Sequence, residues 1–71
     1  MDKAELIEQV VYDVRISRAQ AERALNTILI GIADTIRREG EVYLPGFGIF
    51  RAVRVDQELV IEFHPEFIES I

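Results

Sequence analysis

The sequence predicts an α+β fold in which two helices precede three antiparallel strands and a short last helix. Apolar residues recur at helical spacing as far as Gly40 and at a spacing of two after it. Capping patterns mark two helix starts, and turn residues mark two reversals between strands. We expect one domain over residues 1–71, with a helical hairpin at 3–39, a three-stranded sheet at 41–63 and a C-terminal helix at 65–71.

The first helix is predicted over residues 3–14. Asp2 can cap its start, and Glu5 follows three residues later, as in a capping box. Ile7, Val10 and Val14 then recur at helical spacing, which indicates one amphipathic helix.

The second helix begins after Ser17, which forms a Ser-x-x-Gln capping box with Gln20. Its apolar stripe includes Leu25, Ile28, Leu29 and Ile32. It is expected to stop at Gly40, after Arg37 and Arg38, because glycine ends helices readily and cations favour the carboxyl-terminal end of the helix dipole.

The segment Leu44–Phe50 predicts a sharp corner between two strands. Pro45 has the backbone angle of the first corner of a type II turn, and Gly46 can take the positive φ of the second. Gly48 removes a side chain where the next strand begins. Phe47 and Phe50 flank Gly48 as large apolar anchors, and this spacing of glycines does not match a phosphate-binding loop.

The next two strands are predicted to form a tight hairpin around the two-residue turn Asp56-Gln57. The register that this turn implies places Phe50, Ala52 and Arg54 opposite Phe63, Ile61 and Leu59 on one, mainly apolar, face. On the other face it places Arg51 opposite Glu62, Val53 opposite Val60, and Ile49 opposite His64. The Arg51–Glu62 combination predicts an ion pair.

The last helix is expected to begin at Pro65, because proline fits the first turn of a helix. Glu66 would lie near its positive end, and Phe67, Ile68 and Ile71 would form its apolar stripe.

The length of the chain predicts oligomerisation. A domain of 71 residues usually has too small a core for stability by itself. The chain has no Cys, so a disulfide framework is excluded, while 49% of its residues are hydrophobic. We therefore expect an obligate dimer that covers apolar surface left exposed by one copy.

No residue pattern indicates catalysis, a metal site or a cofactor. His64 is the single histidine and has no Ser, Cys or carboxylate partner at a spacing typical of catalysis. We expect no catalytic residues, no metal ligands, no bound cofactor and no enzymatic activity.

The charge balance argues against strong general DNA binding. Thirteen acidic residues oppose eight Lys and Arg, for a net charge of −5, whereas phosphate contacts need a basic face. The N-terminal segment is not followed by a long apolar run, so neither a signal peptide nor a membrane span is expected, and the expected location is the cytoplasm.

Several segments together resemble one known family. They are Lys3-Ala4-Glu5-Leu6-Ile7, Ser17, Gly40, Val42-Tyr43-Leu44-Pro45-Gly46-Phe47-Gly48-Ile49-Phe50 and Phe63-His64-Pro65. In this order they resemble the bacterial histone-like HU and integration host factor family over nearly the whole chain. The resemblance implies an intertwined dimer, formed through the second helices and phenylalanines, with two long β-arms that grip the DNA minor groove. The residues expected in its core or dimer interface are Leu25, Ile28, Leu29, Ile32, Leu44, Phe47, Phe50, Ile61 and Phe63.

The sequence departs from that family where the arms should be. The family's basic ribbon is replaced by Val55-Asp56-Gln57-Glu58, which closes the hairpin at once. This hairpin has no Pro to act as a wedge, and it carries an acidic residue at its tip. Minor-groove bending is therefore expected to be lost. The last helix, usually basic in the family, carries Glu66 and Glu69.

Two functions follow, and the sequence leaves both open. In the first, an armless HU-like dimer acts as an interaction module or modulator of nucleoid proteins, with another protein bound at an apolar sheet surface formed by Tyr43, Ile49, Val53 and Val60. In the second, a small nucleoid-associated protein binds DNA weakly and without sequence preference, and would then be located at the nucleoid. Its candidate DNA contacts are Lys3, Arg18, Arg51 and Arg54. The sequence does not distinguish a homodimer from a heterodimer, but we take the homodimer as the expected state.

Overall fold

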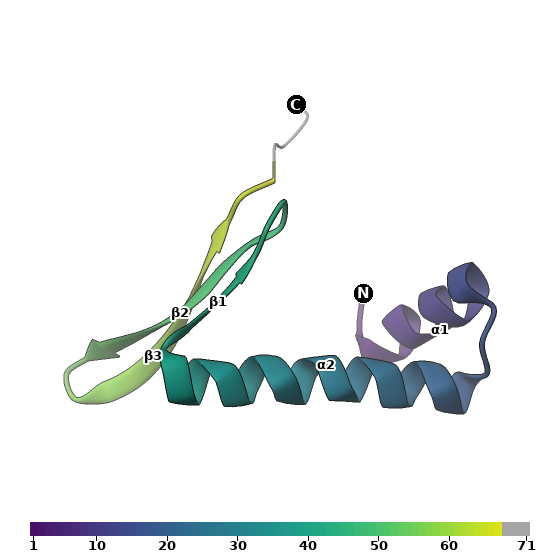
Figure 1. The fold of residues 1–71 in the computed structure, drawn as a ribbon, viewed down its shortest axis with the longest axis horizontal. Coiled ribbons are helices and arrows are strands. Elements are labelled where there is room, and N and C mark those ends of the chain that lie inside the picture. The colour runs from purple at the N-terminus through teal and green to yellow at the C-terminus, as the bar shows by residue number, and fades with distance from the viewer. Residues whose placement is uncertain (68–71) are drawn as a thin grey trace. The chain divides into compact units, whose positions relative to one another are not determined.

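A computed structural model describes residues 1–67 of the chain. The chain consists of two compact units, Met1–Gly31 and Ile32–Ile71. The described elements are two helices followed by three strands, which confirms the predicted α+β order as far as the last strand (Figure 1).

The first unit contains α1 (Lys3–Val14) and the first part of α2 (Arg18–Glu39). The Asp2 carboxylate accepts a hydrogen bond from the Glu5 amide at 2.9 Å, which confirms Asp2 as the N-cap of α1. The helix ends at Arg15, whose φ of 60° is left-handed and whose amide donates to the Val11 carbonyl oxygen at 3.0 Å.

The start of α2 has the predicted capping box. The Gln20 amide donates to Ser17 Oγ at 3.1 Å, and the Ser17 amide donates to Gln20 Oε1 at 2.9 Å. The chain reverses between the helices, so α1 folds back over the beginning of α2 (Figure 1). Ile7 of α1 and Ala21 of α2 are buried in this unit.

The second unit contains the end of α2 and the sheet. Arg37 and Arg38 lie in the last turn of the helix, as predicted. Gly40 has a φ of 85° and donates its amide to the Ile36 carbonyl oxygen at 2.9 Å, so it ends the helix in a left-handed conformation. Ile36 is buried in this unit.

The sheet has the order β1-β2-β3, with both neighbouring pairs antiparallel. Its strands are β1 (Glu41–Leu44), β2 (Gly48–Val55) and β3 (Glu58–Pro65). Between β1 and β2, the Phe47 amide donates to the Leu44 carbonyl oxygen at 2.9 Å and Gly46 has a φ of 81°. Pro45 and Gly46 therefore occupy the corners of the predicted type II turn.

The predicted register of β2 and β3 is confirmed throughout. Phe50 pairs with Phe63, and Arg51 pairs with Glu62. Asp56 and Gln57, between the strands, have φ values of 51° and 67°, the signs of a type I′ hairpin turn.

The prediction for the C-terminal helix is wrong in the part that the structure describes. Pro65 is the last residue of β3 and pairs with Gly48. The Glu66 amide donates to the Phe47 carbonyl oxygen at 2.9 Å, which continues the pairing beyond the strand instead of beginning a helix. The predicted positions from Ile68 to Ile71 lie outside the described residues.

Candidate dimer and nucleic-acid interfaces

The inner face of the sheet carries a cluster of aromatic rings. The ring centroids of Phe50 and Phe63 are 4.8 Å apart, and those of Phe47 and Phe63 are 5.0 Å apart. Phe67 joins the cluster at 6.0 Å from Phe47, although sequence reasoning had assigned it to a helix. These separations are typical of aromatic pairs that stabilise each other.

Gly48 makes this ring packing possible. A Cβ atom there would lie 2.5 Å from the His64 carbonyl oxygen and 2.7 Å from the Phe63 ring. Only a residue without a side chain fits between the backbone of β3 and the ring cluster. This agrees with the predicted role of Gly48 beside Pro45 and Gly46.

The aromatic cluster is not a closed core. Phe47 is 47% exposed and Phe63 is 38% exposed, while Phe50 and Leu44 are half-buried. Ile61, on the same face as Phe63, is also exposed. Large rings in a finished core are rarely this accessible.

The predicted interface residues of α2 are exposed as well. Ile28 is 58% exposed and Leu29 is 47% exposed, whereas Leu25 and Ile32 are half-buried. Among residues 1–67, no large side chain is fully buried. Both units therefore expose apolar surface of a kind that small proteins normally bury.

The outer face of the sheet carries the predicted partner surface. Tyr43 and Val60 are exposed, and Ile49 and Val53 are half-buried. The register places these four residues on one face, across all three strands. We call Tyr43, Ile49, Val53 and Val60 the outer apolar surface.

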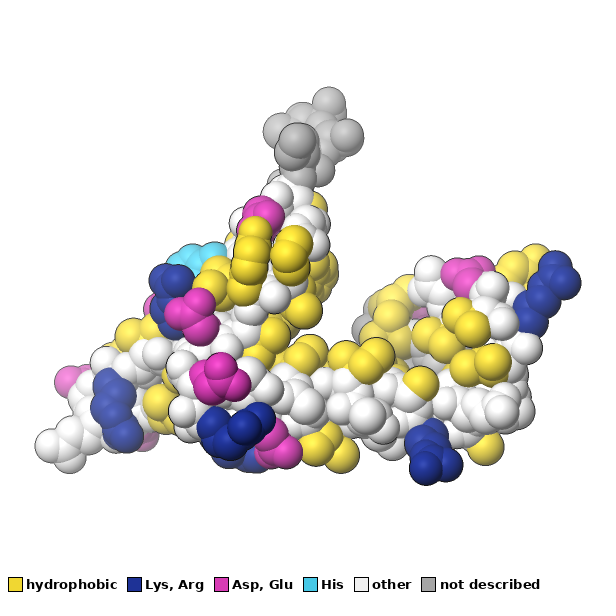
Figure 2. All heavy atoms as spheres, in the orientation of Figure 1, with side chains coloured by type: hydrophobic (Ala, Val, Ile, Leu, Met, Phe, Trp, Pro, Cys, Tyr) yellow, Lys and Arg dark blue, Asp and Glu magenta, His cyan; other side chains and the backbone are white. Residues whose placement is uncertain are grey.

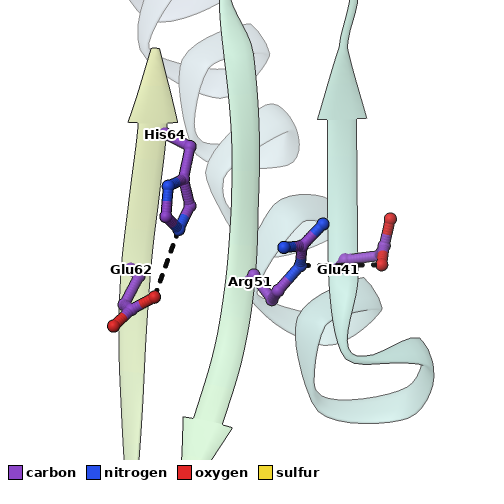
Figure 3. A network of polar contacts seen from close by, with 4 residues as sticks. All are labelled: Glu41, Arg51, Glu62 and His64. Carbon is purple, nitrogen blue, oxygen red and sulfur yellow. Dashed lines mark hydrogen bonds and ion pairs between the residues drawn. The ribbon is translucent and has the colours of Figure 1, made fainter.

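Charged residues border this surface on the same face (Figure 3). Arg51 Nε lies 3.9 Å from Glu41 Oε1, and His64 Nε2 lies 3.1 Å from Glu62 Oε1. The predicted Arg51–Glu62 ion pair is thus replaced by one with Glu41. Arg51 stands on the central strand between the two carboxylates, so the register alone did not decide which one it would contact.

Glu66 connects the end of the described chain to the corner turn. Its Oε1 accepts hydrogen bonds from the Tyr43 hydroxyl at 2.9 Å and the Gly46 amide at 3.3 Å. The hydrogen bond to this carboxylate raises the pKa of Tyr43 above its usual value, because ionised tyrosine could no longer donate it. Sequence reasoning missed these contacts, since Glu66 lies more than twenty residues from Tyr43.

The candidate DNA contacts are exposed but belong to different units. Lys3 and Arg18 lie in the first unit, and Arg51 and Arg54 lie in the second. Arg54 Nη1 donates to the Gln57 carbonyl oxygen at 3.4 Å, and Arg51 has its ion pair with Glu41. On the face in Figure 2, basic side chains are scattered among acidic ones and form no continuous basic field.

Within residues 1–67 no three His, Cys, Asp or Glu side chains gather as metal ligands. An open depression of about 400 Å³ lies along α2, lined by Ala19, Glu22, Arg23, Asn26, Thr27 and Ile30. No helix in the described part of the chain is both long and apolar enough to cross a membrane.

Comparisons with known proteins agree on one family. Residues 1–64 match the family model described as "Bacterial DNA-binding protein". The chain is 38% identical over 50 residues to the DNA-binding protein HU-beta of Salmonella typhimurium, which covers 70% of this chain and 56% of that relative. It is 37% identical over 51 residues to the DNA-binding protein HU-alpha of Vibrio proteolyticus, covering 72% and 57% of the two chains. The chain thus matches little more than half the length of these curated relatives.

A solved structure shows the same fold. An HU mutant from Thermotoga maritima superposes with a TM-score of 0.82 at 27% sequence identity, over 93% of this chain and 89% of that chain. Both kinds of comparison support the resemblance that the corner segment and the helix starts indicated.

Proposed function

Because the chain belongs to the bacterial DNA-binding protein family that includes HU and integration host factor, we propose that it is an HU-like homodimer without DNA-gripping arms. It acts as an interaction module or modulator of nucleoid proteins and does not bend DNA through the minor groove. The cytoplasm is the location that this function implies.

The length of the β2–β3 hairpin carries the proposal. Each strand has eight residues, and the two-residue turn Asp56-Gln57 closes the hairpin. Minor-groove architectural proteins bend DNA with inserted apolar wedges and cationic contacts. This hairpin has no proline at its tip, and it carries Asp56 and Glu58 there.

The exposed apolar residues support the dimer. Ile28, Leu29, Phe47, Ile61 and Phe63 are accessible in a single copy, and burying them would remove apolar area from water. A second copy presents the same residues, so a symmetric interface can cover both sets.

The outer apolar surface is the proposed site for a protein partner. Exposed apolar area bordered by charged residues is typical of protein contacts. A folded variant carrying Val53→Asp and Val60→Asp should lose the partners that the parent protein retains in a pull-down. A folded variant that retains every one of them would overturn this site.

Weak DNA binding is the second candidate, and family membership favours it. The family match includes Lys3, Arg18, Arg51 and Arg54, and the relatives named above are called DNA-binding proteins. In this alternative the four residues contact phosphates without reading sequence, and the dimer is located at the nucleoid.

An anisotropy titration with duplex DNA at about 50 and 200 mM salt separates the two candidates. The first predicts no complex at either salt concentration, and no change in the end-to-end distance of doubly labelled DNA. The second predicts a complex that weakens steeply with salt and weakens again when the four basic residues are replaced by Gln. HU-beta from Salmonella typhimurium serves as the binding control. Sharp bending of DNA by this chain would contradict the armless mechanism.

A further inference from the structure

The free edge of β3 has the features of a pairing site. All eight residues of β3 are exposed, and in the sheet order only β2 lies beside it among the described residues. The opposite edge, β1, has four residues. A long free edge presents unpaired backbone N–H and C=O groups, which favour the addition of another strand.

The hydrogen-bonding pattern identifies which residues of β3 face the free edge. Residues in an antiparallel pair alternate between hydrogen-bonded and non-hydrogen-bonded positions. The Glu66 amide donates to Phe47, so the even-numbered residues of β3 direct their backbone groups toward β2. The Ala52 amide donates to Gly40, away from β3, so its partner Ile61 is in a non-hydrogen-bonded position.

Leu59, Ile61 and Phe63 therefore direct their backbone groups toward the free edge. Across the rest of the described chain, no backbone hydrogen bond outside the sheet and helices reaches these three residues. Their side chains all lie on the inner face of the sheet, so an added strand would extend both the hydrogen-bond ladder and the apolar face.

We infer that this edge pairs with the β3 edge of a second copy, in an antiparallel register centred on Ile61, and so joins one dimer to the next. The inference needs the β3 edge to stay free in the dimer, and it goes beyond the dimer of the proposed function.

The side chains favour this register. Ile61 pairs with the partner's Ile61, and Phe63 pairs with the partner's Leu59, so these three outward-facing residues exchange backbone hydrogen bonds. Pro65 also faces the free edge but has no N–H to donate, so the pairing ends before it. On the outer face, His64 lies opposite the partner's Glu58, and Glu62 lies opposite the partner's Val60. Sliding the strands by two residues in one direction places Glu58 opposite the partner's Glu62. Sliding them by two residues in the other direction places Glu62 opposite the partner's Glu62. Both alternatives bring like charges together, which destabilises strand pairing.

The net negative charge of the chain should weaken this association at low salt. Two copies of a chain with a net charge of −5 repel each other at long range, and salt screens that repulsion. The pairing should therefore strengthen as salt is raised, opposite to the salt dependence of DNA binding.

Sedimentation velocity over a concentration series tests the inference. The parent protein should form species larger than the dimer. Glu58→Lys should weaken their formation about fivefold to tenfold, because it removes the acceptor opposite His64 at two symmetric positions. Glu58→Lys combined with His64→Glu should restore it. Glu8→Lys, the same charge change at an exposed position of α1, should not weaken it. A Glu58→Lys variant that associates as strongly as Glu8→Lys would overturn the inference.

Cysteine scanning tests the register separately, since the chain has no Cys. Ile61→Cys should form a disulfide between copies in a glutathione buffer, because the symmetry axis passes between these two residues. Leu59→Cys, on the same face of the same strand, should not, because it faces the partner's Phe63. The linked Ile61→Cys product should sediment as a species larger than a dimer. A linked product that remains dimeric would place the disulfide inside the dimer and overturn the inference, without affecting the proposed dimer itself.

Discussion

The two turns of the sheet reverse the chain by different means. At the corner between β1 and β2, Pro45 and Gly46 are the residues that a type II turn requires, and Gly46 takes a φ of 81°. At the tip between β2 and β3, Asp56 and Gln57 take φ values of 51° and 67° although neither is glycine. The corner has the residues that its turn type favours, whereas the tip adopts positive φ values at a cost that the pairing of two long strands offsets. The corner places Phe47 in the ring cluster, and the tip closes the hairpin after eight residues of each strand.

The largest expected effect is at the corner. Phe47→Ala should lower the free energy of unfolding by about 3–5 kcal/mol, because Phe47 packs against Phe63 and Phe67 and should be covered by the second copy. Val55→Ala at the exposed tip should cost less than about 1 kcal/mol. Urea denaturation of both variants measures the contrast. Equal small losses would show that Phe47 stays exposed in the folded protein and would contradict the dimer interface.

Gly48→Ala is the next largest expected change. The added Cβ would meet the His64 carbonyl oxygen and the Phe63 ring, so the protein should lose about 2–4 kcal/mol of stability. Gly31→Ala is the matched control, because nothing lies within 4 Å of its Cβ position and alanine favours helix by about 0.5–1 kcal/mol. In thermal unfolding, the melting temperature of Gly48→Ala should lie below that of the parent protein, and the melting temperature of Gly31→Ala should lie above it.

A glycine substitution at the tip should stabilise the protein, whereas the substitutions at Phe47 and Gly48 should destabilise it. Gln57→Gly relieves a positive φ that a residue with a Cβ adopts at a cost, so we expect stabilisation of about 1 kcal/mol. Gln57→Ala keeps that cost and serves as the control. Destabilisation by glycine, measured by urea denaturation, would show that the Gln57 side chain contributes more than its backbone conformation costs.

The smallest expected effect concerns the hydroxyl beside the corner. The hydrogen bond to Glu66 raises the pKa of Tyr43, so the folded state holds the phenol proton more tightly than the unfolded state. Its stabilisation is fully present below the usual tyrosine pKa of 10.0 and is lost as the pH rises through the higher folded value.

Absorbance titration of tyrosinate measures this shift in a Tyr12→Phe background, which leaves Tyr43 as the single tyrosine. Adding Glu66→Ala should lower the midpoint toward the usual range. An unchanged midpoint would mean that the Tyr43–Glu66 hydrogen bond is not formed in solution.

Local sequence determined the helices, the turns and the strand register. Asp2, Ser17 and Gly40 act through hydrogen bonds to residues three or four positions away, so their roles can be read from spacing. The two-residue turn fixes the register of the hairpin, because its length determines which residue of β3 lies opposite each residue of β2.

Only the tertiary structure decided the contacts between distant segments. Pro65 fits a helix start by local rules, but pairing with Gly48 keeps it in β3, and Glu66 then reaches Tyr43 and Gly46. Arg51 had two carboxylates within reach of its strand position, and side-chain geometry selected Glu41. Exposure of the phenylalanines was also beyond local prediction, because burial depends on what the rest of the chain leaves uncovered.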